Sequence, residues 1–419
     1  MMRDILLAHG DHPAALAGLR LDQIRSLEAI AACGTEAMGT HAEACDHCGD
    51  ARRVPNTCGN RCCPHCQGRR RLAWVAARQA ELLPVNYFHV VMTLPSDLRP
   101  LSHVVPDVVL GALMHTASDT IDEVCRNDRF LGGEVGQLAV LHTWRRDLHW
   151  HPHVHLIVTA GAWDAARQRW IPAKRFGPEQ TPFLAPVAVV RSVFKRRLIT
   201  ALRRAYQRGE LDAGRTLCPD LTDAATFEAL LARCSEPDWV IRIEPPFGGP
   251  QQLLKYLGAY VSRVAISPKR ILAHDPIAGT VTYTWTTNAE PDRPQQATLP
   301  VAAFIRLFAQ HILPPRFQRI RFRGLWSTAT RATKLHLVQR HLGGCPQPPP
   351  PSPSPTPATP ANQQPEAPDD PYRCPCCGIG TYQRQPGPCP RPSPHQRRTI
   401  LMRLRQGLRA TPHGATTTA

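Results

Sequence analysis

The sequence predicts an α+β protein in which a cysteine-rich N-terminal segment precedes a larger region of strands and helices. Between residues 84 and 335, runs of alternating apolar residues and runs with apolar residues three or four positions apart follow one another. Six of the 15 cysteines lie between Cys45 and Cys66. Twelve of the 26 residues from Pro346 to Pro371 are proline, which is typical of an extended linker.

These features divide the chain into four parts. Residues 1–83 contain an N-terminal helix and the cysteine-rich domain, and residues 84–335 form the main domain. Residues 346–371 are the proline-rich linker, and residues 372–419 are a basic tail with its own cysteines. We expect the C-terminal region to be disordered, because so much proline and charge leaves little apolar surface to bury.

Composition narrows the class of protein. The formal net charge is +17 and the isoelectric point is near 9.6, which favours a polyanionic partner. No apolar run approaches the roughly 20 residues of a membrane span. The N-terminal residues lack the apolar core of a signal peptide, so we expect a cytoplasmic protein. In that compartment, clustered cysteines indicate metal-bound thiolates rather than disulfides.

Each helix and strand is predicted from the local pattern of apolar, β-branched and aromatic residues. Apolar residues at helical spacing predict helix within residues 1–32, and a basic helix follows the first cysteine cluster and ends at Pro84. β-Branched and aromatic residues predict strands at 86–94, 137–144, 151–159, 238–246, 280–286 and 316–324. Helical periodicity predicts helices at 107–128, 186–208, 250–267 and 301–313.

Four histidines occupy alternate positions from residue 149 to residue 155, where the strand 151–159 begins. Side chains alternate between the two faces of a strand, so His151, His153 and His155 share one face and Val154 takes the other, apolar face. Imidazoles that point the same way can hold one divalent ion. The alternatives are surface histidines on an edge strand and a hydrolytic zinc site.

A hairpin supplies a third ligand. If the turn between strands 137–144 and 151–159 centres near residues 147–148, His142 lies opposite His153, at about 5 Å. The predicted site is therefore His153, His155 and His142, with His151 and then His89 as substitutes.

Two tyrosines could provide a nucleophile. Tyr256 and Tyr260 are four residues apart in the predicted helix 250–267, so they project from one face. A phenol can attack phosphorus when a cation polarises the scissile phosphate. The alternative is that both tyrosines pack at the margin of the core.

These residues resemble the HUH superfamily of single-strand nucleases, in which two histidines flank a hydrophobic residue, here His153-Val154-His155. The chain is more closely similar to the two-tyrosine rolling-circle transposases of the insertion sequence 91 family. The stretches that carry the resemblance are EACDHCGDARRVPNTCGNRCCPHCQGRRR, NYFHVVMTLP, LHTW, HPHVHLIV, KYLGAYVSRVAIS and LPPRFQRIRFRG. The chain has Cys62 where that family usually has histidine.

The resemblance implies a fold, a reaction and a cofactor. It implies an HUH-type catalytic domain over residues 84–335, with a central antiparallel sheet flanked by helices. It also implies Mg²⁺ or Mn²⁺ at the histidines, Tyr256 and Tyr260 as nucleophiles, and cleavage of single-stranded DNA ends through a 5′-phosphotyrosine. A plasmid replication initiator or relaxase, a zinc-dependent DNA-binding protein without catalysis, and a metallohydrolase of small phosphoesters are the alternatives.

The cysteine spacing predicts a zinc site. Cys45-x₂-Cys48 and Cys63-x₂-Cys66 are separated by 14 residues, close to the spacing of a four-cysteine ribbon, with Cys58 and Cys62 as substitute ligands. The tail carries one further pair, Cys374-x₂-Cys377, whose completion would need Cys389 or His395.

Basic residues in three helices and one strand are the predicted DNA contacts, because their charges have one sign. They are Arg69, Arg70, Arg71, Lys195, Arg196, Arg197, Arg263, Arg319, Arg321 and Arg323. The sequence contains no nucleotide-binding P-loop, so strand separation would need a host helicase and replication proteins. We expect no membrane partner and a nucleoid-associated protein of bacterial type.

Overall fold

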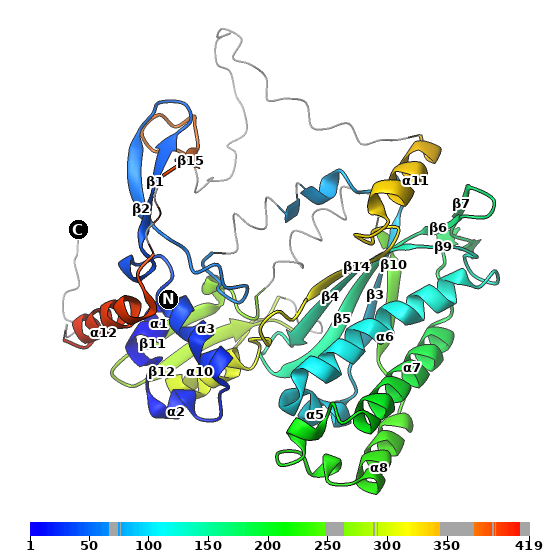
Figure 1. Cartoon of the computed structure of the whole chain (residues 1–419), viewed down its shortest axis with the longest axis horizontal. Helices are drawn as coiled ribbons and strands as arrows, with labels where there is room; N and C mark the ends of the chain where they lie inside the picture. Colours follow the sequence, from blue (N-terminus) through cyan, green and yellow to red (C-terminus); the bar gives the residue numbers. More distant parts are fainter. Residues whose placement is uncertain are drawn as a thin grey trace.

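A computed structural model of the 419-residue chain shows two lobes side by side (Figure 1). The structure describes residues 1–66, 74–75, 77–178, 180–247, 264–287, 290, 292–343, 373–387, 389 and 391–410. No helix in these ranges is both long and apolar enough to cross a membrane.

The larger lobe is built on a five-stranded sheet with the strand order β10-β3-β5-β4-β14. Its strands are β3 (Tyr87–Thr93), β4 (Gly136–Trp144), β5 (Trp150–Thr159), β10 (Ile241–Phe247) and β14 (Ile320–Gly324). Every neighbouring pair in this sheet is antiparallel. The structure therefore contains the expected antiparallel sheet, and each of these strands falls within or beside its predicted range.

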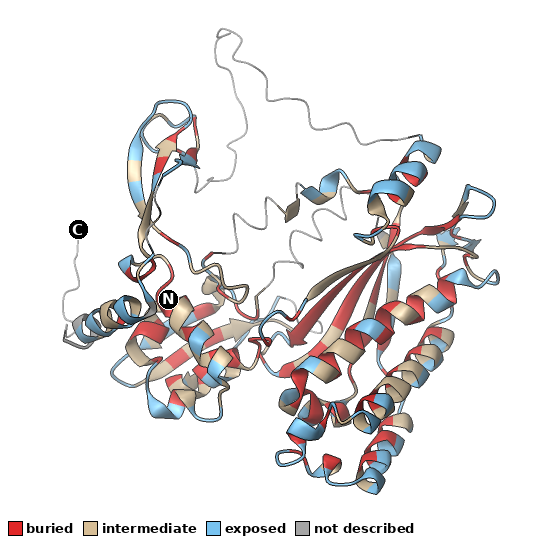
Figure 2. Cartoon of the chain, in the orientation of Figure 1, coloured by how far each residue is buried: buried red, intermediate tan, exposed pale blue. Residues whose placement is uncertain are grey.

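Helices cover one face of this sheet (Figures 1 and 2). They are α6 (Pro106–Arg126), α7 (Val187–Gln207) and α8 (Ala224–Ser235). In α7, the residues Val190, Phe194, Leu198 and Leu202 recur every four positions, which gives the helix one apolar stripe. These side chains share a buried core with Val154 and the other residues of β5 that point toward the helices. The histidines of β5 therefore lie on the opposite face of the sheet.

The second lobe has its own core, which joins the two ends of the described chain. The helices α1 (Met2–His9), α2 (Pro13–Leu16), α3 (Leu21–Ala31) and α10 (Val301–Ala309) pack with a three-stranded antiparallel sheet of order β11-β12-β13. The strands of that sheet are β11 (Ile271–Asp275), β12 (Thr280–Trp285) and β13 (Gln295–Pro300). The buried residues of this core include several between Ala265 and Ile312, a stretch expected in the main domain.

Residues 1–32 form three helices rather than one. Pro13 occupies the first turn of α2, and Gly18 has a φ of 74°, a left-handed conformation that ends helices. Each short helix can then turn its own apolar side chains into the second core.

The C-terminal tail differs from the expected disorder. Strand β15 (Tyr382–Arg384) pairs antiparallel with β1 (Thr40–Cys45), which also pairs with β2 (Ala51–Pro55). Helix α12 (Pro394–Ala410) packs on α1, with Leu401 buried in the second core. Residues on the far side of the proline-rich linker therefore complete the N-terminal domain. The linker itself, 346–371, lies outside the described residues.

The remaining elements are short and connect these units. They are η1 (Glu36–Met38), η2 (Ser96–Leu98), α5 (Arg99–Val104), β6 (Gly161–Asp164), β7 (Arg169–Pro172), β8 (Arg175–Phe176), β9 (Thr181–Pro182), η3 (Asp212–Gly214), η4 (Pro219–Leu221), η5 (Pro268–Arg270), η6 (Arg331–Leu335) and α11 (His336–His341). Of the predicted helix 250–267, only residues 264–267 are described, and these four are not helical.

A neutral histidine lies buried at the contact between the two lobes. The Nε2–H of His311 donates to the Leu148 carbonyl at 2.8 Å, so Nδ1 accepts from the Thr143 hydroxyl at 3.2 Å. Burial lowers the pKa of His311 to about 3. The unfolded chain takes up this proton below about pH 6.5 and the folded chain does not. Stability is therefore lost as the pH falls from 6.5 toward 3.

We expect His311→Gln to reduce the stability at pH 7 and also to flatten its dependence on pH between 6.5 and 4. One proton accounts for at most about 1.4 kcal/mol per pH unit. Urea unfolding at a series of pH values measures both effects, with the exposed His149→Gln as control. Parallel pH curves for His311→Gln and the wild type would contradict the assignment.

Candidate functional site

Three histidines converge on the face of the main sheet that lies opposite α6 and α7. In the β4–β5 ladder His142 pairs with His153, as the sequence predicted. His155 lies two residues further along β5, and one ring nitrogen from each of the three side chains lies within 4.8 Å of the others. His142 and His155 are buried and His153 is half-buried. The substitutes His151 and His89 lie beside this group and do not belong to it.

A chain of hydrogen bonds fixes the ring of His155. The carboxylate of Glu244 can only accept, so the Nδ1–H of His89 donates to it at 2.7 Å. Burial lowers the pKa of His89, although Glu244 opposes the shift, and the neutral ring then accepts at Nε2. The Nδ1–H of His155 donates to that Nε2 at 2.8 Å. The lone pair of His155 is thereby placed on Nε2.

The ring of His153 is oriented in the same way by a different partner. Its Nδ1–H donates to the His151 carbonyl at 2.7 Å, which leaves the lone pair on Nε2. Burial lowers the pKa of His151 to about 4, with the neighbouring His153 adding to the shift. The lone pairs of His153 and His155 on Nε2 are of the kind that bind divalent ions.

The cluster lies in an open cleft of about 510 Å³. The cleft is also lined by the two tryptophans Trp144 and Trp285 and by arginines that the sequence analysis did not select: Arg145, Arg146, Arg242 and Arg270. Arg145 and Arg146 lie in the β4–β5 turn, which the sequence marks only as polar. Arg270 approaches the turn from η5 of the second lobe, and its guanidinium donates to the Arg146 carbonyl.

The predicted nucleophiles Tyr256 and Tyr260, together with Arg263, lie outside the described residues. Described residues before and after this segment lie at the cleft. Glu244 of β10, the strand that precedes the segment 248–263, lines the cleft, and so does Arg270, which follows it.

Three of the predicted DNA contacts on α7 and β14 have acidic partners from α6. Arg196 and Arg197 both form ion pairs with Glu123, at 2.8 Å and 2.5 Å, and Arg323 pairs with Asp119 at 3.0 Å. Lys195 donates to a backbone carbonyl. Arg321 lines a different cleft, on the helix-covered side of the sheet. None of these side chains lines the histidine cleft.

Four other predicted contacts remain, of which only Arg319 is among the described residues. Arg319 is half-buried beside Arg61 and Cys62, and burial lowers its pKa. Arg69, Arg70 and Arg71 fall in a stretch outside the described residues. In the helix predicted there, the described residues 74–75 and 77–79 are helical and residues 80–83 are not.

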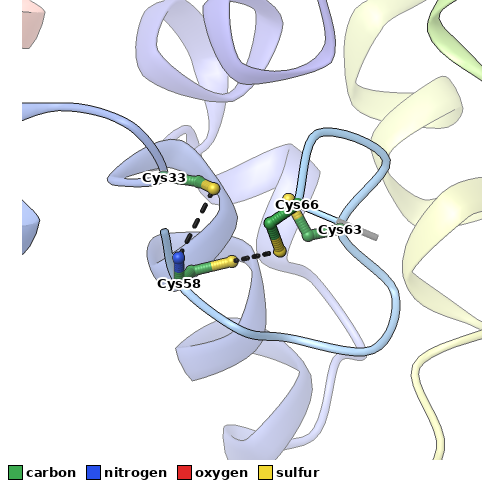
Figure 3. Close-up of side chains that lie close together, drawn as sticks. All are labelled: Cys33, Cys58, Cys63 and Cys66. Atoms are coloured by element: carbon green, nitrogen blue, oxygen red, sulfur yellow. Dashed lines mark hydrogen bonds between the residues drawn. The ribbon is translucent and has the colours of Figure 1, made fainter. Parts of the chain in front are cut away.

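The cysteines form two separate clusters, which corrects the predicted single ribbon. Cys63 and Cys66 lie with Cys58 and Cys33, and the four sulfur atoms are within 4.8 Å of one another. Figure 3 shows Cys33 and Cys58 facing the Cys63–Cys66 turn. The Cys58 and Cys66 sulfurs are 3.7 Å apart.

The other pair, Cys45 and Cys48, lies with Cys374 and Cys377 of the tail. Spacing along the sequence groups only cysteines that are close in the chain, so it missed Cys33 and the partners in the tail. The substitute Cys62 is in neither cluster and contacts the His311 carbonyl instead.

Comparisons with known proteins agree with this arrangement. A family described as "Transposase zinc-binding domain" matches residues 5–94, and a family described as "Putative transposase" matches residues 136–334. The chain is 37% identical over 341 residues to "Putative transposase y4qJ" of Sinorhizobium fredii, which covers 81% of this chain and 83% of that protein. No solved structure matches the chain significantly.

A second relative links the chain to a mobile element. The chain is 28% identical over 366 residues to "Transposase for insertion sequence element IS801" of Pseudomonas savastanoi pv. phaseolicola. The match covers 86% of this chain and 83% of that protein. Both matched families and both relatives together show that the chain belongs to the insertion sequence 91 family of transposases.

Proposed function

We propose that this transposase cleaves and rejoins single-stranded DNA at the ends of its mobile element, with Tyr256 or Tyr260 as the nucleophile. The observation that carries the proposal is the convergence of His142, His153 and His155 in a cleft rimmed by arginines. A cation site beside a basic, open cleft fits a phosphodiester substrate better than it fits a small neutral molecule.

The histidines fit a divalent ion, Mg²⁺ or Mn²⁺. Hydrogen bonds to Nδ1 leave the lone pairs of His153 and His155 on Nε2. A ring nitrogen of His142 lies within 4.8 Å of ring nitrogens of both. When bound, the ion would withdraw charge from the non-bridging oxygens of the scissile phosphate.

The reaction exchanges one phosphodiester for another. The tyrosine oxygen forms a bond to phosphorus, the bond from phosphorus to the 3′ oxygen breaks, and the proton of the phenol ends on the released 3′-hydroxyl. The product is a 5′-phosphotyrosine, and attack on it by a 3′-hydroxyl reverses the sequence. Because Glu244 before this segment and Arg270 after it both line the cleft, residues 248–263 are a suitable source of the nucleophile.

The cleft also offers groups that bind a single strand. Among the described residues, Arg146 and Arg242 form no ion pair with an acidic side chain, so their charges remain for phosphates. Trp285 is half-buried at the cleft and can stack on a base.

Phenylalanine at both tyrosines tests the nucleophile. We expect purified wild-type protein with Mn²⁺ and a single-stranded oligonucleotide of the element's end to form an adduct that survives denaturation. Tyr256→Phe/Tyr260→Phe should abolish it, because phenylalanine has no oxygen to attack phosphorus. Tyr206→Phe, on α7 against Phe227, is the matched control and should keep it. Adduct formation by the double variant would refute the assignment, and footprinting without any adduct would favour a DNA-binding role.

Substitution of the histidines tests the metal site. We expect His153→Ala and His155→Ala to abolish Mn²⁺ binding in calorimetry, and His89→Ala to weaken it about 10- to 100-fold, because His89 only orients His155. His149→Ala is the control, since His149 is exposed in the turn. Equal Mn²⁺ affinity in the His153, His155 and His149 variants would contradict the site.

The arginines can be separated by salt dependence. We expect Arg146→Ala and Arg242→Ala each to reduce the slope of log affinity against log salt for single-stranded DNA by about 0.7, the value for one phosphate contact. Arg196→Ala/Arg197→Ala should change the slope less, because both side chains pair with Glu123. The reverse order would place the strand on the helix-covered side of the sheet.

A further inference from the structure

We propose that the chain holds a second structural zinc ion in a site split between its two ends, with Cys45, Cys48, Cys374 and Cys377 as ligands. The matched zinc-binding domain covers residues 5–94 and so contains only half of this set. The other half follows the proline-rich linker. The site is separate from the cluster of Cys33, Cys58, Cys63 and Cys66.

The sulfur positions fit one tetrahedral ion. Cys45 and Cys377 sulfurs are 3.7 Å apart, Cys48 and Cys374 sulfurs are 3.8 Å apart, and all four lie within 4.8 Å of one another. Four thiolates at the usual zinc–sulfur distance of about 2.3 Å stand about 3.8 Å from each other. A disulfide would bring two sulfurs to about 2 Å.

The two halves of the site have matching backbone geometry. Each half is a Cys-x₂-Cys-Gly turn, and the glycines Gly49 and Gly378 have left-handed φ angles of 74° and 65°. In each half a backbone N–H points at a ligand sulfur: His47 donates to Cys45 and Gly380 donates to Cys377, both at 3.4 Å. Such bonds stabilise metal-bound thiolates.

The tail turn lies directly against the hairpin turn. A Cβ atom at Gly380 would stand 2.6 Å from the Cys45 sulfur, so only glycine allows this approach. Asp46 accepts hydrogen bonds from the backbone N–H and hydroxyl of Thr381 at 2.8 Å and 3.0 Å. The guanidinium of Arg52 lies 3.5 Å from the centre of the Tyr382 ring. These contacts select the tail as the partner of the hairpin.

These contacts alone contribute little stability to a pairing between two segments that lie so far apart in the chain. The ladder between β1 and β15 has three residue pairs, and the sulfurs it brings together are 326 and 332 residues apart in the chain. Zinc binding by four thiolates supplies the missing free energy. The ion would thus hold the tail, and helix α12 behind it, on the N-terminal domain.

Zinc content of the full-length protein tests the proposal. We expect Cys374→Ser/Cys377→Ser to contain one zinc fewer per chain than the wild type by elemental analysis. The matched control is Cys376→Ser, because Cys376 lies between the two ligands, is exposed and belongs to neither cluster. Equal zinc content in the wild type and the double variant would overturn the proposal.

A measurement on the wild type covers the case in which the double variant does not fold. Native protein is alkylated before and after chelation and the cysteines are read by mass spectrometry. We expect Cys374 and Cys377 to be protected until zinc is removed, and Cys376 to react in both states. Reaction of all three cysteines before chelation would refute the site.

A protease site inserted between residues 350 and 365 tests the closure itself. After cleavage, the two fragments should elute together in size-exclusion chromatography and separate when zinc is chelated. Fragments that separate while zinc is still bound would overturn the split site.

Discussion

The antiparallel pairing of β4 with β5 in one register is the constraint on which the candidate site depends. His142 faces His153 only in that register, since a shift of one residue would turn His142 toward the helices. The register is fixed by burial: Val154 and Leu156 alternate into the core beneath α6 and α7. The hydrophobic effect on one face of the sheet thus places the histidine side chains on the other.

The second lobe holds the turn of this hairpin. Leu148 and Trp144 are buried in the core formed by the N-terminal helices and α10. Backbone carbonyls of the turn accept hydrogen bonds from Tyr283 at Asp147, and from Gln310 and His311 at Leu148. The second lobe is therefore more than a module beside the main sheet, because its packing restrains the loop that presents Arg146 to the cleft.

Two kinds of interaction hold the second lobe and its β1–β2 hairpin together. Apolar side chains from α1, α3 and α10 form a compact core, whereas the β1–β2 hairpin has almost no apolar core of its own. In the part of the chain that the structure describes, the buried cluster there consists of Cys45, Cys374 and Tyr382. A small element with so little apolar burial needs a covalent or metal link to be stable, and the clustered cysteines supply the ligands for one.

The sequence by itself determined most elements of the larger lobe and the histidine cluster, because both follow from local periodicity. The strand and helix patterns predicted β3, β4, β5, α6 and α7 within a few residues, and alternation with a short turn was enough to place His142 opposite His153. The assignment of Tyr256 and Tyr260 came from the resemblance and from helical spacing, and it stays a prediction.

Only the tertiary structure decided which distant residues meet. Glu244 and His89 come from strands far apart in the chain, yet together they orient His155. The cysteine pairs were visible in the sequence, but spacing could not show that Cys45 and Cys48 face the tail rather than Cys63 and Cys66. Sequence periodicity reports local geometry, whereas partners across the fold are chosen by packing and by the closure of long loops, which no local pattern encodes.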